Sequence, residues 1–382
     1  MRRRHRAPLS ASQWALFVTA GYFVSGVFAF PRVVAGIAGR AGLWAVVTDG
    51  VIFGGVLWAT VQVQRHFPDV SLWVMSSRLL GRPCGVTLNG LVWLYHWAVT
   101  IVGVAEFGFI IQTYFLPNTP RGVIVGALVG TALYMVWSGT ASLARTLQAG
   151  AFPVIGLVIL TAGLASLSVR HPGLMMPTIP LPLGPVAQAA EQTAILFLGM
   201  PLMVTLYPEI DPVHRRRAVR AAYGAFLGVI GWLMGLYAVL LATFGPAYVT
   251  QMRWPVVSLL RIMSVAGFWA DKVGLLALML WTIALVGFTS VRMHCLRWAA
   301  PAFGLKTDTR AMHHQSLFLG ASVVGGVLLI PNATVNGWLA HRVLIPAGWA
   351  ATAGMPGLVG LVAWVRSVWP QKIRWRPPTV GD

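Results

Sequence analysis

Apolar stretches of about 17–25 residues recur along almost the whole chain, separated by short segments that carry Pro, Gly and charge. At 1.5 Å per residue, a helix of this length crosses a hydrocarbon core about 30 Å thick. Of the 382 residues, 57% are hydrophobic and 10% are charged, whereas a soluble domain has about 25% charged residues. The pattern therefore predicts an all-α integral membrane protein.

The sequence predicts about ten transmembrane helices, and residues 1–382 form a single transmembrane domain. Two connections are longer than the rest. Residues 169–189 are rich in proline and are predicted to form an extended, lid-like stretch, and residues 244–269 are predicted to hold a surface helix. The ten spans have the approximate ranges 13–36, 42–64, 86–115, 122–138, 147–168, 190–207, 219–243, 270–294, 315–331 and 342–366.

The basic residues predict the orientation, because Lys and Arg accumulate in short cytosolic segments. With the N-terminus inside, 20 of the 28 Lys and Arg residues, Arg292 among them, fall in the predicted cytosolic segments. Both termini are then cytosolic, and residues 367–382 form a cytosolic tail. The net charge of +19 follows from this topology. It does not indicate nucleic-acid binding, since no soluble domain with a basic face is visible.

No motif for catalysis, metal binding or cofactor binding stands out. Cys84 and Cys295 lack metal-ligand spacing and are predicted to lie on the cytosolic side as free thiols. There is no Walker loop, no zinc signature and no nucleophile–base pair among the spans. We therefore predict no catalytic residues, no metal, no cofactor and no enzymatic activity.

Spans one and six are interrupted by glycine and proline. Each is the first span of a five-span half, 1–168 or 190–366, and because five is odd the second half is inverted relative to the first. Bared backbone groups cost several kcal/mol in lipid, so breaks survive only where protein or a polar cavity covers them. Interrupted spans at matching positions of inverted halves indicate a binding site at mid-membrane. The interrupting residues are Gly21, Ser25, Gly26 and Pro31 in or after span one, and Gly199, Pro201 and Pro208 in or after span six.

Two interpretations of these breaks remain open at this point. Exposed amides hold an anionic group and exposed carbonyls a cationic one, and an amino acid carries both. Alternatively, the glycines let helices pack closely, as small residues do in membrane bundles.

Acidic residues inside the spans are rare. Glu106 lies within span three, where a carboxylate indicates either a functional site or an internal hydrogen bond between helices. Asp49 and Glu191 stand near the ends of their spans and are predicted to be interfacial. His96 is predicted to be a packed or interfacial residue.

Several motifs, taken in order, resemble the endospore germination permease family, the B subunits of nutrient germinant receptors within the amino acid–polyamine–organocation (APC) superfamily. The resemblance covers nearly the whole chain. It rests on residues 25–32 (SGVFAFPR), 115–120 (FLPNTP), 197–200 (FLGM), 207–209 (YPE), Trp254-Pro255 with Ser258-Leu259, and 303–305 (FGL).

This resemblance implies a LeuT/APC-like fold, a five-plus-five inverted repeat in which helices one and six are broken. It also implies A and C germinant-receptor subunits as partners, the spore inner membrane as the location, and an amino acid, sugar or nucleoside as ligand. Where the family usually has Arg-Glu in span three, this chain has Ala105-Glu106, and Pro201 departs from most members. The ligand-binding residues that the resemblance implies are Gly21, Tyr22, Ser25, Gly26, Val27, Glu106, Phe197, Gly199, Met200 and Thr205.

Two functions follow from these observations. The first is a spore germination protein, a permease-like subunit of a nutrient germinant receptor, which binds a small nutrient at mid-membrane and signals to partner subunits. The second is a proton- or sodium-coupled amino acid transporter. Broken helices fit both functions equally, so only the family resemblance favours the receptor.

Overall fold

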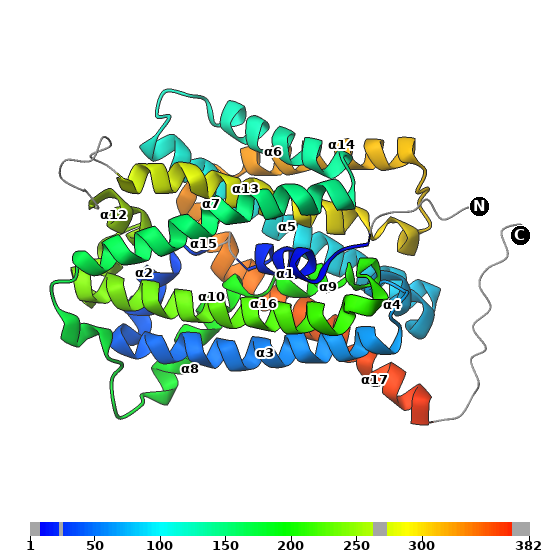
Figure 1. Ribbon diagram of the computed structural model, residues 1–382, viewed down its shortest axis with the longest axis horizontal. Helices are drawn as coiled ribbons and strands as arrows, with labels where there is room; N and C mark the ends of the chain where they lie inside the picture. Colours follow the sequence, from blue (N-terminus) through cyan, green and yellow to red (C-terminus); the bar gives the residue numbers. More distant parts are fainter. Residues whose placement is uncertain (1–7, 23–25, 263–272, 369–382) are drawn as a thin grey trace, which may run out of the picture.

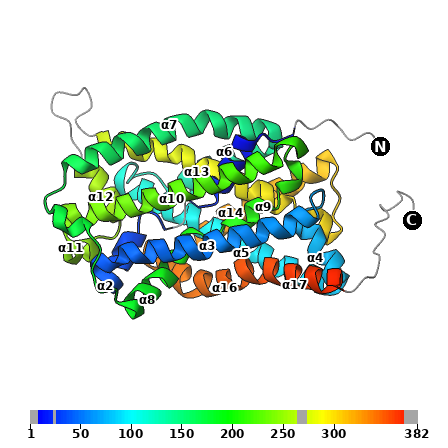
Figure 2. The same cartoon turned by 60° about the horizontal axis from the view of Figure 1, so that its bottom comes forward.

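The computed structural model describes residues 8–22, 26–262 and 273–368, and within them all regular structure is helical. The helices run along the long axis of an elongated bundle (Figures 1 and 2). The start of α1 and the end of α17 lie at the same end of this bundle, which we call the terminal end (Figure 1). We call the other end, where α12 lies, the far end.

Every predicted span coincides with a helix or with a pair of broken helices. Seven helical stretches are long and apolar enough to cross a membrane, and an eighth arises if α8 and α9, bent by 41° at their break, form one span. One of the seven, Phe30–His66, runs from α2 through α3. If α2 is assigned to a broken span with α1, and α6, an apolar helix of 17 residues, is added, the ten predicted spans are accounted for. The spans are α1 (Ala11–Ala20) with α2 (Phe30–Ala38), α3 (Gly42–His66), α5 (Arg82–Tyr114), α6 (Arg121–Trp137), α7 (Thr140–Leu167), α8 (Leu183–Thr193) with α9 (Met200–Val204), α10 (Arg215–Phe244), α13 (Val273–Arg297), α14 (Thr309–Leu329), and α15 (Ala333–Trp338) with α16 (Ile345–Trp349) and α17 (Met355–Val368).

Short polar side chains set where several helices begin. Ser10 caps α1 through a capping box, in which Gln13 N donates to Ser10 Oγ and Ser10 N donates to Gln13 Oε1. Asp308 and Asn332 cap α14 and α15 in the same way, by accepting from amides of the first turn. Each cap satisfies amides that the helix itself leaves without partners, so these boundaries are encoded locally.

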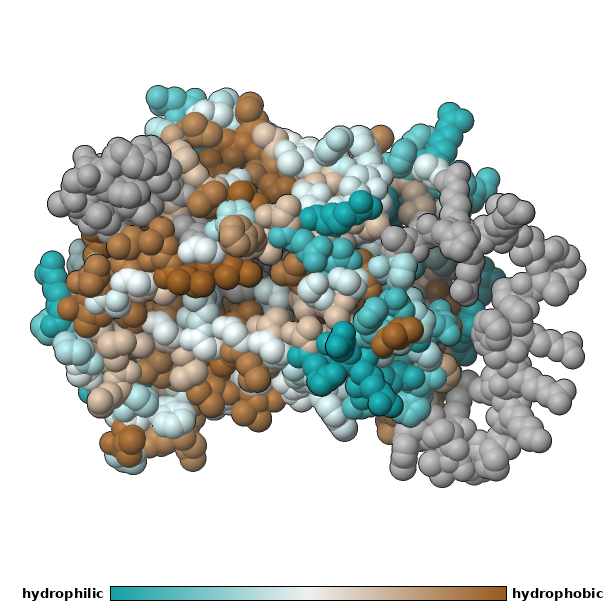
Figure 3. Space-filling view, in the orientation of Figure 1, coloured by the Kyte–Doolittle hydropathy of each residue, from teal (hydrophilic) through white to brown (hydrophobic). Residues whose placement is uncertain are grey.

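Large apolar side chains cover the sides of the bundle. Phe152 and Leu167 on α7 are 84% and 82% exposed, and Leu329 on α14 is 84% exposed. Figure 3 shows apolar residues spread over the middle of one face, with hydrophilic residues gathering toward the terminal end. Such a surface suits lipid, because apolar patches of this extent are rare on soluble monomers.

Two predicted connections differ from the structure. Residues 169–189 are not extended throughout, because a 3₁₀ turn forms at Pro172–Met175 and α8 begins at Leu183. Residues 244–262 form two short helices, α11 (Pro246–Gln251) and α12 (Pro255–Ile262), in place of one, and the rest of that predicted segment lies outside the described residues. Besides these, α4 (Leu72–Leu80) lies between α3 and α5.

The two broken spans lie side by side in opposite directions. α1 packs against α9, and α2 packs against α8, so the first half of each span meets the second half of the other. At the terminal end, Leu9 and Ile210 form a bridge in which Leu9 N donates to Glu209 O at 2.8 Å. The opposite directions of the two spans are what two inverted halves require, and the α1–α9 and α2–α8 contacts bring the two breaks to the same depth.

Candidate functional site

The break in span one lies between α1 and α2. Gly21 ends α1, and Gly26 has a φ of +99°, a left-handed conformation that L side chains rarely adopt. The carbonyl of Gly26 accepts from the amides of Ala29 and Phe30, which starts α2. Gly26 is therefore needed for the change of chain direction. Ser25, also predicted to bind ligand, lies outside the described residues.

The break in span six is covered by a neighbouring helix. A 3₁₀ turn at Ala194–Leu196 ends the first half, and α9 begins at Met200 with Pro201 in its first turn, where its missing N–H costs nothing. The carbonyl of Leu198 accepts a hydrogen bond of 2.8 Å from Thr352 Oγ1. Thr352 lies in a π-helical stretch, Ala350–Gly354, of the last span. A protein side chain thus satisfies a carbonyl that the break bares.

Backbone atoms of the two breaks approach each other closely. A methyl group built on Gly199 would lie 2.8 Å from the carbonyl oxygen of Gly21. A methyl group built on Gly21 would lie 3.0 Å from Met203 Cγ and 3.4 Å from Met200 Cα. Both glycines have right-handed backbone conformations, with φ of −69° at Gly21 and −86° at Gly199. Close packing therefore favours glycine at this crossing, most strictly at Gly199.

Aromatic rings surround the crossing. The ring of Phe197 lies 5.9 Å from that of Tyr22 and stacks on that of Phe53 at 5.2 Å, and Phe53 stacks in turn on Trp349. All four side chains come from different spans, and Phe197 is fully buried. The stack joins spans one, two, six and ten around the break.

Arg292 lies at the same crossing, and its predicted place in a cytosolic segment is wrong. Its side chain is 0% exposed, because α13 continues to Arg297 and carries Arg292 inside the bundle. Nε donates to Thr100 Oγ1 at 3.2 Å, and Nη2 lies 3.0 Å from His96 Nδ1. A methyl group built on Gly199 would lie 2.2 Å from Nη1. The guanidinium therefore fills the space that Gly199 leaves open.

Three buried polar groups at the span-six break have no hydrogen-bond partner within the described residues: Nη1 of Arg292 and the hydroxyls of Tyr22 and Tyr95. Tyr22 borders Phe197. The hydroxyl of Tyr95 and Leu198 Cδ1 would both lie 2.5 Å from a methyl group built on Gly348. Buried polar groups are normally paired, and each exception calls for an explanation.

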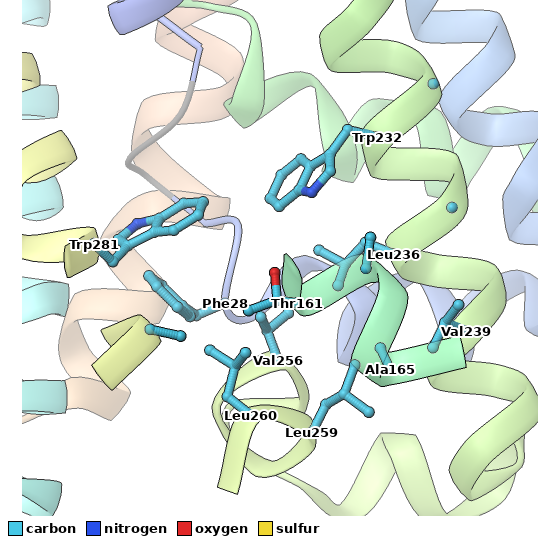
Figure 4. Close-up of a pocket in the computed structure, with 14 residues that line it drawn as sticks. Phe28, Thr161, Ala165, Trp232, Leu236, Val239, Val256, Leu259, Leu260 and Trp281 are labelled. Carbon is cyan, nitrogen blue, oxygen red and sulfur yellow. The ribbon is translucent and has the colours of Figure 1, made fainter. Parts of the chain in front are cut away.

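An apolar cavity of about 230 Å³ lies beside the break in span one. Phe28 forms part of its wall, with Trp232, Trp281 and Leu236 opposite and beside it (Figure 4). The Phe28 and Trp281 rings are 5.5 Å apart and the Trp232 and Trp281 rings are 5.7 Å apart. A second cavity, of about 10 Å³, touches His96 and Thr205.

A sequence profile of the family described as "Spore germination protein", a permease family, matches residues 8–334. This chain belongs to the spore germination permease family. Among curated relatives, spore germination proteins B2 and A2 of Bacillus subtilis (strain 168) are 22% and 21% identical to this permease. The B2 alignment covers 73% of this chain and 75% of the relative, and the A2 alignment covers 75% and 78%.

Two solved structures share the fold of this permease. A Na⁺-coupled sialic acid symporter, in a substrate-bound outward-open state, superposes with a TM-score of 0.60 at 12% identity, over 92% of this chain and 78% of that one. MhsT in complex with L-phenylalanine gives a TM-score of 0.56 at 15% identity, over 96% and 91%. The predicted LeuT/APC-like fold is thereby confirmed.

The predicted ligand-binding residues of this permease separate into groups. The structure brings one group together at the crossing: Gly21, Tyr22, Phe197, Gly199 and Met200. Gly26 contacts the other side of the break, since a methyl built on it would lie 3.2 Å from Ile195 Cγ2, and Val27 follows it as a buried residue. Thr205 is the buried C-cap residue of α9, and its hydroxyl donates to Leu202 O at 2.5 Å.

Glu106 is engaged elsewhere. Oε1 accepts from Trp254 Nε1 at 2.6 Å, and Oε2 accepts from Asn336 Nδ2 at 2.8 Å. Trp254 precedes α12 and Asn336 lies in α15, so neither partner belongs to the breaks. The carboxylate joins span three to the far-end connection and to the last span, and its role as a ligand contact stays a prediction.

Two further residues lie deeper than the sequence predicted. Asp49 is fully buried in α3, where it accepts a hydrogen bond from Thr193 Oγ1 through Oδ2, while Oδ1 has no partner within the described residues. Cys295 is also fully buried, with Sγ 3.7 Å from Met203 Sδ. Both were predicted from their nearness to a span end. α13 ends at Arg297, three residues beyond the predicted edge, which places Cys295 inside the helix. α3 begins at Gly42, as predicted, and Asp49 is buried because it faces Thr193 of α8.

Proposed function

We propose that this permease is a subunit of a nutrient germinant receptor, which binds a small nutrient at the crossing of spans one and six and passes a conformational change to partner subunits. The observation that carries the proposal is the group of three unpartnered polar atoms around the span-six break. A solute bound between the broken helices supplies the missing partners. Family membership supports germination as the process that responds.

The partners in this proposal are A and C germinant-receptor subunits, and the location is the spore inner membrane with both termini in the cytosol. The start of α1 and the end of α17 share one end of the bundle, which supports a common side for the termini. The excess of Lys and Arg in the predicted cytosolic segments of the sequence supports the cytosol as that side. No catalytic role is proposed.

Two conservative substitutions test the binding site. Tyr22→Phe and Tyr95→Phe each remove one unpartnered hydroxyl and keep the ring. The purified protein in nanodiscs is screened by thermal shift against amino acids, sugars and nucleosides, because a ligand that binds the folded state raises its stability. We expect the shift of the active compound to fall in both variants, with the melting temperature without ligand unchanged.

Tyr134→Phe is the matched control, since Tyr134 is 74% exposed on α6. The same three variants are placed in spores, and germination is followed with the active compound. If the Tyr22 and Tyr95 variants respond like Tyr134→Phe in both assays, the ligand does not bind at the crossing.

A second function, proton- or sodium-coupled amino acid transport, is supported by one specific observation. Asp49 is a buried carboxylate with a free oxygen, and an acidic residue inside a span commonly marks an ion or proton pathway. Uptake of radiolabelled amino acid into proteoliposomes under a proton or sodium gradient separates the two functions. Gradient-driven accumulation favours the transporter, and binding without accumulation favours the receptor.

A further inference from the structure

The guanidinium of Arg292 brings a positive charge into the bundle without an acidic partner. Its side chain is 0% exposed. Within the described residues, the ion pairs are those of His214 with Asp211 and of Arg215 with Asp69, neither of which involves Arg292. An unpaired charge out of water costs several kcal/mol. The buried charge of Arg292 therefore indicates an anionic partner outside the described residues, such as a bound ligand.

Span three fixes the orientation of this guanidinium. Nε and Nη2, which form one edge of the guanidinium fork, contact Thr100 and His96. These two side chains are four residues apart on α5, and therefore on the same helix face. The ring of Phe288, one turn before Arg292 on α13, lies under the guanidinium at 4.9 Å. These contacts hold the side chain in place and occupy one edge.

The remaining edge points at the crossing of the broken helices. Nη1 has no acceptor within the described residues. It borders the Cα of Gly199, and the Gly21 carbonyl borders the same space from span one. A side chain at Gly199 would fill this space. The site therefore combines a fixed cationic donor with a carbonyl acceptor from the end of α1.

We propose that Arg292 anchors the carboxylate of the nutrient, an assignment that rests on the proposed function of the crossing as the binding site. A guanidinium edge matches a carboxylate in shape and charge, and charge-assisted bonds of this type are about twice as strong as neutral ones. The Gly21 carbonyl accepts from a ligand ammonium group. A neutral sugar or nucleoside leaves the charge of Arg292 unpaired, so the site selects carboxylate-bearing compounds, amino acids among them.

Binding at this site requires the helices to move. The space in front of Nη1 is too small even for a methyl group, because a methyl built on Gly199 would lie 2.2 Å from Nη1 and 2.8 Å from the carbonyl oxygen of Gly21. A carboxylate reaches Nη1 only when α1 and α9 separate at Gly21 and Gly199. Ligand binding is thereby linked to the relative position of the two broken spans. A change in this position is the conformational change that the receptor passes to its partner subunits.

The test compares acids with their neutral counterparts on the wild-type protein. Thermal shift in nanodiscs is measured with each of the common amino acids and with its carboxamide, and with glucose and inosine. Titrations are repeated on Arg292→Gln and Arg292→Lys, with Arg310→Gln, an exposed arginine, as control. We expect the active amino acid to shift the wild type and the Arg310 variant, its amide to give no shift, and Arg292→Gln to weaken affinity roughly ten- to a hundredfold.

Arg292→Gln removes an unpaired buried charge, so it is expected to fold at least as well as the wild type. The comparison of acid with amide needs no variant and decides the assignment even if a substituted protein misfolds. Equal shifts by acid and amide, or by glucose or inosine alone, overturn the carboxylate assignment and leave nutrient binding at the crossing intact. A chloride-dependent shift lost in Arg292→Gln, with no response to carboxylates, shows an inorganic anion site and overturns it too. No response to any compound overturns both proposals.

Discussion

Gly199 and Arg292 occupy one space between spans six and eight: a methyl group built on Gly199 would lie 2.2 Å from Nη1 of Arg292. The guanidinium of Arg292 can be buried here only because Gly199 has no side chain. The break in span six thus has a second effect besides exposing backbone groups. It also opens a place for a side chain from span eight. A glycine that interrupts one span and an arginine near the end of another therefore form one site.

Gly199→Ala is expected to destabilise the protein and weaken its response to ligand. The added methyl meets both the guanidinium and the Gly21 carbonyl, and overpacking of this type costs about 1–3 kcal/mol. Thermal unfolding and ligand-induced shift measure the two effects. Gly228→Ala is the control, because nothing lies within 4 Å of a methyl group built there. Equal stability of the two variants would show that the crossing accommodates a methyl group at Gly199 without a steric clash.

Glu106→Gln is expected to lower the free energy of unfolding by about 1–3 kcal/mol, because both carboxylate oxygens accept from donors and glutamine offers one acceptor. Rotating the Asn336 amide does not repair this, since Asn336 Nδ2 also donates to Val102 O at 3.2 Å. Denaturant unfolding in detergent measures the loss. Glu191→Gln, at an exposed site, serves as control. A Glu106 variant as stable as that control would show that the hydrogen bonds to Trp254 and Asn336 do not stabilise the fold.

Thr352→Val is expected to destabilise the break in span six. Valine keeps the shape but removes the hydroxyl that donates to Leu198 O, and an unsatisfied buried acceptor costs about 1–3 kcal/mol. Thr131→Val on α6 is the matched control, because the Thr131 hydroxyl is bonded to its own helix at Ala127 O on an exposed face. Melting temperatures of the two variants are compared, and the prediction fails if they fall equally.

Reporter fusions test the proposed orientation. Fusions at Lys306 and after Asp382 are expected to report the cytosol, and a fusion after Arg170 the outside. Arg170 follows α7, and its amide bonds to Ala242 O near the end of α10, whereas Lys306 lies in the connection between α13 and α14. An outside signal at the C-terminus would contradict the ten-span topology.

The hydropathy pattern was sufficient for the helices and for the two breaks, since apolar length and Gly/Pro interruptions are local properties. It also placed Gly21, Gly199 and Phe197 in the breaks, which the inverted arrangement brings together. The partners of the breaks were not predictable in this way. Thr352 donates a hydrogen bond to the carbonyl of Leu198, 154 residues away in the sequence. No local sequence pattern encodes such a contact.

Arg292 was missed for a physical reason. Positive charge near the end of an apolar run ordinarily marks a loop, and the positive-inside rule then assigns it to the cytosol. The signal that distinguishes it is its own helix: His294, Cys295 and Leu296 continue the pattern, and all three are buried. Asp49 was misplaced for another reason. The predicted start of its span was correct, but its hydrogen-bond partner, Thr193 on α8, is 144 residues away in the sequence.

Asp49 and Thr193 are expected to depend on each other. Thr193→Val removes the donor to Asp49 Oδ2 and leaves a buried carboxylate with no hydrogen bond within the described residues, which costs about 1–3 kcal/mol or more. Asp49→Asn keeps an acceptor for Thr193 and removes the charge, so its stability should equal or exceed that of the wild type. In Asp49→Asn, the further change Thr193→Val should cost less than it does in the wild type. The double-mutant cycle, measured by denaturant unfolding, gives the coupling energy. A coupling near zero would show that the two side chains are neighbours without a bond, and a less stable Asp49→Asn would show that the charge is compensated.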